Sequence, residues 1–157
     1  MNESLKLKLI IVFSLAGIGI SSYLILHHYG YFVDLAHLCN IADKVNCDIV
    51  NFGPYSEIFG IPTASFGLVW FISVLMIAAY SLKNKDMMIY KFLFIWSIVA
   101  VAFAGYLIYL EIFVIQYFCL FCTTAHALGI LIFILAFSLR KAKPSKIQEA
   151  ASLKESL

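Results

Sequence analysis

LIIVFSLAGIGISSYLILHHYGYFV, residues 9–33, is an uncharged run that follows Lys6 and Lys8. About 20 apolar residues cross the hydrocarbon core of a bilayer as a helix, so we expect a transmembrane helix over residues 7–29. A secretory signal peptide also has a basic start, but its apolar core is only about 7–15 residues long and a small-x-small cleavage site follows it. Because this run is longer and no such site follows, we expect it to be retained as a membrane span.

The composition of the whole chain also indicates a membrane protein. Hydrophobic residues make up 63% of the 157 residues and charged residues 13%, and the mean hydropathy is +0.95; soluble domains carry about 25% charged residues. Further apolar runs predict spans over residues 62–82, 87–111 and 119–139. We therefore expect an all-α membrane protein, a four-transmembrane-helix bundle formed by residues 1–140 as a single domain, with a polar cytoplasmic tail over residues 141–157.

The basic residues predict the orientation of the bundle. Four spans place both termini on one side, and cytoplasmic segments are enriched in Lys and Arg. Of the 11 Lys and Arg residues, only Lys44 lies in the loop of residues 30–61 between the first two spans. We therefore expect an inner (cytoplasmic) membrane protein with cytoplasmic termini and a long extracytoplasmic loop. The remaining basic residues are Lys6, Lys8, Lys83, Lys85, Lys91, Arg140, Lys141, Lys143, Lys146 and Lys154.

The long loop and the surface of the bundle suggest where partners would act. A loop of this length usually carries function, and we expect a short interfacial helix over residues 33–44 within it. The expected partner of the apolar surface is the lipid bilayer. The net charge of +2 is too small to argue for nucleic acid as a partner.

All four cysteines fall at the predicted outer face. Cys39 and Cys47 lie in the long loop, while Cys119 and Cys122 form a C-x-x-C motif at the start of the last span. On a helix the second pair could form a disulfide or face one reactant as thiols, and Cys119 would lie in the first turn, where the helix dipole favours a reactive thiolate. Cysteines can also pack as small apolar residues. Their gathering on the side where disulfides persist favours a redox function.

Two metal-based alternatives fit less well, and we predict no metal. Zinc sites usually bring their ligands in pairs about two to four residues apart, whereas seven residues separate Cys39 from Cys47. A haem b site would need two histidines facing each other at comparable depth. His126 lies well inside a span, but His27 and His28 are expected to solvate the outer end of the first helix.

Four stretches of the sequence form one pattern. They are the loop pair Cys39 and Cys47, then Gly53-Pro54-Tyr55, then Phe59-Gly60-Ile61-Pro62-Thr63-Ala64-Ser65-Phe66-Gly67, and finally Cys119-Leu120-Phe121-Cys122-Thr123-Thr124. Together they resemble the vitamin K epoxide reductase family, bacterial type, over nearly all of residues 7–139. The order of the cysteines separates this family from DsbB-type enzymes, which also oxidise thiols with a quinone in a helical bundle, because there the C-x-x-C precedes the separated cysteine pair and here it follows.

The resemblance implies a thiol:quinone oxidoreductase that supports disulfide formation. Cys39 would meet the thiol of a separate DsbA-like or other thioredoxin-fold protein, Cys47 would exchange with Cys119, and Cys122 would lie beside the ring of menaquinone or ubiquinone. We expect a separate partner because the chain ends about 18 residues after the last span, without the fused thioredoxin-like domain of many bacterial relatives. The alternatives are vitamin K quinone or epoxide reduction, and a non-catalytic membrane protein with structural disulfides.

The candidate quinone-binding residues lie near the C-x-x-C. The resemblance aligns Thr63 with an asparagine that binds the quinone in animal enzymes and His126 with a tyrosine near the quinone, while Gly53 replaces a serine of many members. The apolar body of a quinone would suit an aromatic pocket. The candidates are Thr63, Phe66, Trp70, Phe118, Phe121 and His126.

Overall fold

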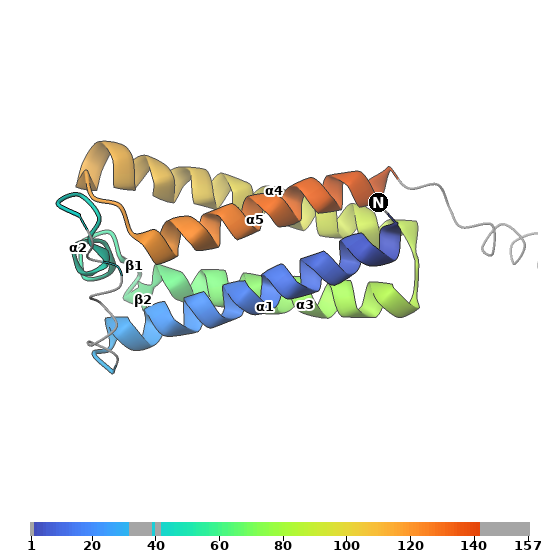
Figure 1. The fold of residues 1–157 in the computed structure, drawn as a ribbon, viewed down its shortest axis with the longest axis horizontal. Helices are drawn as coiled ribbons and strands as arrows, with labels where there is room; N and C mark the ends of the chain where they lie inside the picture. The colour runs from blue at the N-terminus through green and yellow to red at the C-terminus, as the bar shows by residue number, and fades with distance from the viewer. Residues whose placement is uncertain (1, 32–38, 40–41, 142–157) are drawn as a thin grey trace, which may run out of the picture.

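The computed structural model describes residues 2–31, 39 and 42–141. In this part of the chain four long helices run side by side as a bundle (Figure 1). Each is long and apolar enough to cross a membrane, with mean hydropathies between 1.9 and 2.4. The predicted four-helix membrane bundle is confirmed, and the protein is a multi-pass membrane protein. The helices are α1 (Glu3–His28), α3 (Thr63–Lys83), α4 (Met87–Tyr109) and α5 (Leu120–Arg140).

The third span continues past its expected end. A π-helix, η2 (Leu110–Ile115), extends α4, so that the apolar segment covers residues Met87–Ile115. π-helical turns are rare and frequently occur at functional sites. Gln116 then adopts a left-handed conformation with φ of 59°, which ends the helix. The connection to α5 is therefore only four residues long, from Gln116 to Cys119.

Local chemistry sets where the helices begin. Pro62 directly precedes α3, where a residue without an N–H leaves no helical hydrogen bond unmade. At the start of α4, Asp86 Oδ1 accepts a hydrogen bond from the backbone N–H of Met88 at 2.9 Å. Side chains of this kind satisfy the unpaired N–H groups of the first turn. The start of α3 sets where the loop between α1 and α3 joins the bundle, and the start of α4 lies at the opposite end.

The helices pack through two cores, one in the bundle and one around the cysteines. α1 packs against α3 and α5, and α4 packs against α5. Gly17 of α1 lies against the ring of Phe71 on α3 so closely that a Cβ at this position would overlap the ring. The main core contains Leu7, Ile10, Trp70, Phe71, Val74, Ala78, Tyr90, Leu93, Ile132, Ala136 and Leu139. The second core contains Leu24, Cys39, Cys47 and Cys119.

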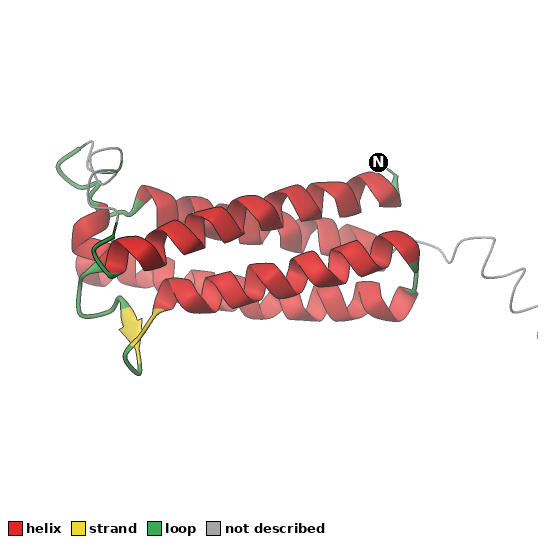
Figure 2. Cartoon of the chain, turned by 90° about the horizontal axis from the view of Figure 1, so that it is seen from below, coloured by secondary structure: helices red, strands yellow, loops and turns green. Residues whose placement is uncertain are grey.

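The loop between α1 and α3 covers one end of the bundle, and the first residue of α1 lies at the other end (Figure 1). The described part of this loop contains a short helix, α2 (Cys47–Asn51), and a two-stranded hairpin, which is yellow in Figure 2. The strands of the hairpin are β1 (Glu57–Ile58) and β2 (Ile61–Pro62). The short helix expected over residues 33–44 lies mostly outside the described residues, and residues 42–45 form a turn. The polar tail from residue 142 onward also lies outside them.

Candidate active site

Three cysteine sulfurs meet at the loop end of the bundle. Cys39 and Cys47 form a disulfide with their Cα atoms 5.7 Å apart. The thiol sulfur of Cys119 lies 3.2 Å from Cys47 Sγ. The three sulfurs lie within 4.8 Å of one another, and all three residues are buried. The loop pair and the C-x-x-C are thus in contact, with Cys47 between Cys39 and Cys119.

A short backbone pairing brings Cys47 to Cys119. The N–H of Phe118 donates to the carbonyl of Lys44 at 2.8 Å, and the N–H of Asn46 donates to the carbonyl of Phe118 at 3.0 Å. This parallel bridge aligns the chain just before α2 with the chain just before α5. The next residues on the two segments are the two cysteines, so the pairing fixes their sulfurs side by side.

The end of α1 holds α2, and with it Cys47, in place. His27 Nε2 lies 3.1 Å from Asp48 Oδ1, and Asn51 Nδ2 donates to His27 Nδ1 at 3.0 Å. His28 contacts the Asn51 carbonyl at 2.7 Å and Glu57 Oε1 at 2.9 Å. We expected both histidines to solvate the helix end, but His27 is only 1% exposed because α2 covers it. Both side chains instead bind the loop.

Cys119 occupies the N-cap position of α5, one residue before the first turn in which we expected it. Its Sγ accepts a hydrogen bond from the backbone N–H of Cys122 at 3.2 Å. The N-cap position also lies at the positive end of the helix dipole, which stabilises negative charge on the sulfur. The position therefore suits a sulfur that reacts as a thiolate. Cys122 has a free thiol too, and it lies on the cavity side of the motif.

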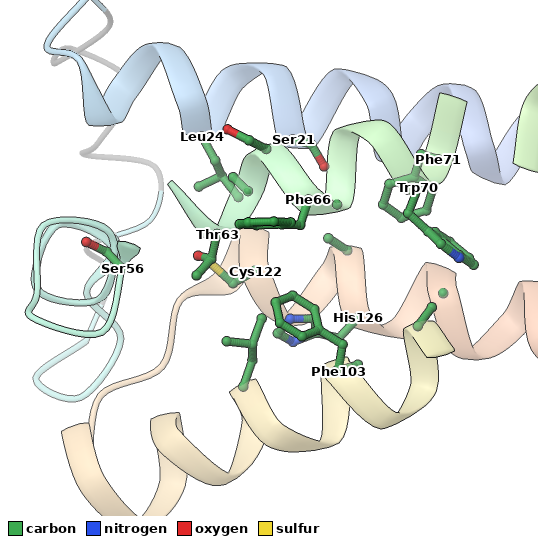
Figure 3. A pocket seen from close by; sticks show the side chains of 18 of the residues that line it. Ser21, Leu24, Ser56, Thr63, Phe66, Trp70, Phe71, Phe103, Cys122 and His126 are labelled. Atoms are coloured by element: carbon green, nitrogen blue, oxygen red, sulfur yellow. The ribbon is translucent and has the colours of Figure 1, made fainter. Parts of the chain in front are cut away.

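An apolar cavity of about 630 Å³ begins at Cys122 and runs along the inside of the bundle. In Figure 3, Cys122 and Thr63 lie toward the loop end, His126 and Phe103 lie further along, and Trp70 lies deepest. Its remaining wall residues are mostly aliphatic or aromatic, so the cavity suits an apolar ligand with a few polar groups. They include Leu24, Val50, Ile61, Ala64, Phe66, Val69, Phe71, Trp96, Val99, Ala100, Ala104, Leu107, Leu110, Ile115, Ala125 and Gly129.

The predicted quinone-binding residues divide between the cavity and the cysteine core. Thr63, Phe66, Trp70 and His126 line the cavity. Phe118 and Phe121 are not among its wall residues. The Phe118 backbone pairs with the loop, and the Phe121 ring packs 4.9 Å from the ring of Tyr23 beside the cysteines. A quinone contact at any of the six residues stays a prediction.

Several polar wall residues were not among the site residues predicted from the sequence. Asn51, Tyr55 and Ser56 come from the loop, and Glu111 comes from η2. Glu111 is 4% exposed, although its charge in the sequence suggested that it marks the end of the third span. The sequence feature that could have identified Glu111 is its carboxyl group within an apolar run, since such groups are energetically costly in a membrane and usually functional.

One side of the cavity faces the lipid. Phe66 and Val69 of α3 and Val99 of α4 line the cavity and are also among the exposed apolar residues of the bundle. These side chains therefore form a rim between α3 and α4. An apolar ligand could extend past this rim from the cavity into the hydrocarbon region of the bilayer.

The fold and the site together define a class of protein: a four-helix membrane oxidoreductase with two cysteine pairs beside an apolar cavity. A sequence model of the vitamin K epoxide reductase family matches residues 8–137 of the chain. The protein belongs to this family, as the resemblance predicted. Proteins of the family use quinones, which agrees with the apolar character of the cavity.

Proposed function

We propose that the protein is a membrane thiol:quinone oxidoreductase that supports disulfide formation outside the cytoplasm. The observation that carries the proposal is the 3.2 Å contact between the free Cys119 sulfur and the bridged Cys47 sulfur. Thiol–disulfide exchange requires a thiolate to reach a disulfide sulfur directly. Since Cys122 lies on the cavity wall, the four cysteines provide a route for two electrons from the loop to the cavity.

The outer half of the reaction would be an exchange with a separate DsbA-like, thioredoxin-fold protein. One thiolate of the reduced partner attacks Cys39 Sγ, and Cys47 leaves as a thiolate. The second partner thiolate then resolves the mixed disulfide, so the partner leaves oxidised and both loop cysteines become thiols. Because Cys39 is fully buried in the bridged state, the loop must open for the first attack.

The inner half passes the two electrons toward the cavity. The Cys47 thiolate attacks Cys119 within a Cys119–Cys122 disulfide and releases Cys122. Cys39 then attacks Cys47 and releases Cys119, which restores the loop bridge and leaves the inner pair reduced. The structure has this arrangement of bonds, with Cys39 joined to Cys47 and the C-x-x-C thiols free.

Quinone reduction would complete the cycle. The inner thiols lose two electrons and two protons as their S–S bond forms, and the quinone gains both and becomes a quinol. The cavity volume falls within the range of about 300–1,000 Å³ common for small-molecule sites. His126 Nδ1 is buried without a hydrogen-bond partner among the described residues, so it and the Thr63 hydroxyl are candidate partners for the quinone oxygens. The isoprenoid tail of menaquinone or ubiquinone would leave past Phe66 and Val99.

The proposed orientation follows from the two ends of the bundle. The start of α1 and the end of α5 lie together, opposite the cysteine end (Figure 1). Among the described residues, every Lys and Arg except Lys44 belongs to the segments at the end where α1 starts and α5 ends. The positive-inside rule then supports cytoplasmic termini in the inner (cytoplasmic) membrane and cysteines at the extracytoplasmic face.

The experiment uses purified protein, a reduced thioredoxin-fold protein and a one-isoprene menaquinone. We expect one partner disulfide to form for each quinone reduced. Cys122→Ser should abolish quinone reduction while the partner still exchanges with the Cys39–Cys47 bridge. Unchanged turnover in that variant would overturn the role given to Cys122. The same assay with vitamin K epoxide tests the alternative substrate.

Thiol trapping in membranes distinguishes catalysis from a structural role. If the protein is catalytic, the fraction of Cys119 and Cys122 found as thiols should fall when quinone is supplied and rise when it is removed. A thiol fraction that does not follow the quinone supply would indicate a non-catalytic membrane protein with a structural disulfide.

A further inference from the structure

Glu111 is a buried carboxyl group that the electron route described above does not use. It lies in η2 and lines the same cavity as Cys122 and His126. Within the described part of the chain, no Lys, Arg or His side chain forms an ion pair with it. An isolated carboxyl group in a membrane span is energetically unfavourable, so it is usually retained for function.

The π-helix holds Glu111 on the cavity wall. Leu107, Leu110, Glu111 and Ile115 all line the cavity, and they follow one another at the spacing of a single helical face. The sequence predicted that the span ends at Glu111, whereas η2 continues it to Ile115. With η2 the carboxyl group lies inside the bundle, level with the first turn of α5.

The contact of Glu111 with Thr123 can accommodate two protonation states. Thr123 Oγ1 lies 3.3 Å from Glu111 Oε2 and 2.9 Å from the Cys119 carbonyl oxygen. The hydroxyl has one hydrogen and two lone pairs. When Glu111 is ionised, Thr123 can donate to it. When Glu111 is protonated, Thr123 can donate to the Cys119 carbonyl and accept from the carboxyl group. Glu111 therefore keeps a partner whether or not it holds a proton.

We propose that Glu111 transfers a proton between the C-x-x-C thiols and the quinone, an inference that rests on the proposed function. As the Cys119–Cys122 bond forms, the two thiols release two electrons and two protons. Glu111 accepts one proton from the thiol pair and donates one to a quinone oxygen, so it ends each turnover as it began. The second proton passes from the thiol pair to the other quinone oxygen, and the quinol leaves with both electrons and both protons.

A structural role for Glu111 makes a different prediction. If the side chain only joined η2 to α5 through Thr123, Glu111→Gln would preserve the contact, because a glutamine oxygen also accepts a hydrogen bond. Thr123→Val would remove the contact and keep the shape of the side chain. If the role of Glu111 is only structural, E111Q should keep the quinone reductase activity and T123V should lower it. If Glu111 transfers a proton, E111Q should lower the activity.

The test measures quinone reduction by the purified full-length protein, with dithiothreitol as the electron donor and one-isoprene menaquinone as the acceptor. We expect E111Q to lower kcat by about a hundredfold, within the range of general acid–base catalysis, and to leave KM for the quinone within about threefold. E111D should retain more activity than E111Q, and T123V should lose less. Glu3→Gln is the matched control. Glu3 is the first residue of α1, at the end of the bundle opposite the cysteines, so this variant should have wild-type rates.

A second measurement separates lost chemistry from lost structure. Thiol trapping should show the Cys39–Cys47 bridge in E111Q at the wild-type level. A kcat of E111Q within about threefold of wild type, a T123V loss as large as that of E111Q, or loss of the loop bridge in E111Q would each overturn the proton-transfer role. If the wild-type protein itself reduces no quinone, the proposed function fails instead.

Discussion

Replacing His27 with phenylalanine should loosen the attachment of α2 to the bundle. The ring keeps its approximate shape, so its packing against Tyr23 and Phe52, with ring centroids 5.8 and 5.1 Å away, can remain. The two polar contacts of His27, with Asp48 at 3.1 Å and with Asn51 at 3.0 Å, are lost. The variant therefore isolates the polar contribution to holding α2, and Cys47 with it.

The magnitude follows from the burial of the two partners. Asn51 is 7% exposed, so its abandoned N–H group costs about 1–3 kcal/mol. The Asp48 side chain is 40% exposed, so solvent screening limits its contact to at most about 1 kcal/mol. We take about 2 kcal/mol for the sum. Because about 1.4 kcal/mol corresponds to a factor of ten, the population with α2 detached should rise about 30-fold.

Alkylation of Cys119 measures this population. Its thiol is 0% exposed beneath Cys47, so a maleimide reaches it only when α2 moves away. When opening and closing are fast relative to labelling, the labelling rate is proportional to the open population. The experiment uses the Cys122→Ser protein as the parent, and mass spectrometry follows the labelling. In the His27→Phe variant of this parent, the maleimide should label Cys119 about 30-fold faster.

Phe52→Leu is the control, since it removes ring contacts but keeps the polar contacts of His27. Phe52 is 53% exposed, so we expect its two ring contacts, with His27 and His28, to contribute about 0.5 kcal/mol each and the labelling rate to stay within about fivefold of the parent. A His27→Phe labelling rate within about twofold of the parent would show that these polar contacts do not hold α2.

Three further predictions concern the relay, the loop and the cavity. With quinone present, Cys39→Ser should accumulate a Cys47–Cys119 disulfide, detected by peptide mapping, because the sulfurs lie 3.2 Å apart and the resolving thiol is missing. Asn46→Ala removes the N-cap bond of α2 and should lower local stability by about 1 kcal/mol, measured as roughly fivefold faster Cys119 alkylation. Gly129→Leu should raise KM for quinone by about tenfold, because the leucine side chain would enter open space on the cavity wall. As the control, the rate at which dithiothreitol reduces the loop bridge should not change.

The membrane spans could be predicted because hydropathy is a local property of the sequence. The expected bounds of the first two spans, 7–29 and 62–82, differ from the observed helices by a few residues at most. The end of the third span could not be predicted in this way. A charged residue normally marks the membrane boundary, but Glu111 finds a hydrogen-bond partner on the next helix and remains inside the bundle.

The polar contacts of the loop could not be read from sequence patterns. His27 and Asn51 lie 24 residues apart, and nothing in the intervening sequence has a period that would bring them together. The pairing depends on how the loop folds back over the end of α1. For the same reason, the position of Phe121 beside Tyr23 rather than on the cavity wall needs the packing of α1 against α5.

The position of the cysteines at one end of the bundle has a physical reason. In this protein the two cysteine pairs meet where the backbone leaves the helices, because Cys47 is the first residue of α2 and Cys119 is the N-cap of α5. Such backbone is tolerated near a membrane only if its N–H and C=O groups find partners. Here the segments before α2 and α5 satisfy each other through Lys44, Asn46 and Phe118. The pairing that places Cys47 against Cys119 is therefore also the one that lets both helices begin at this depth.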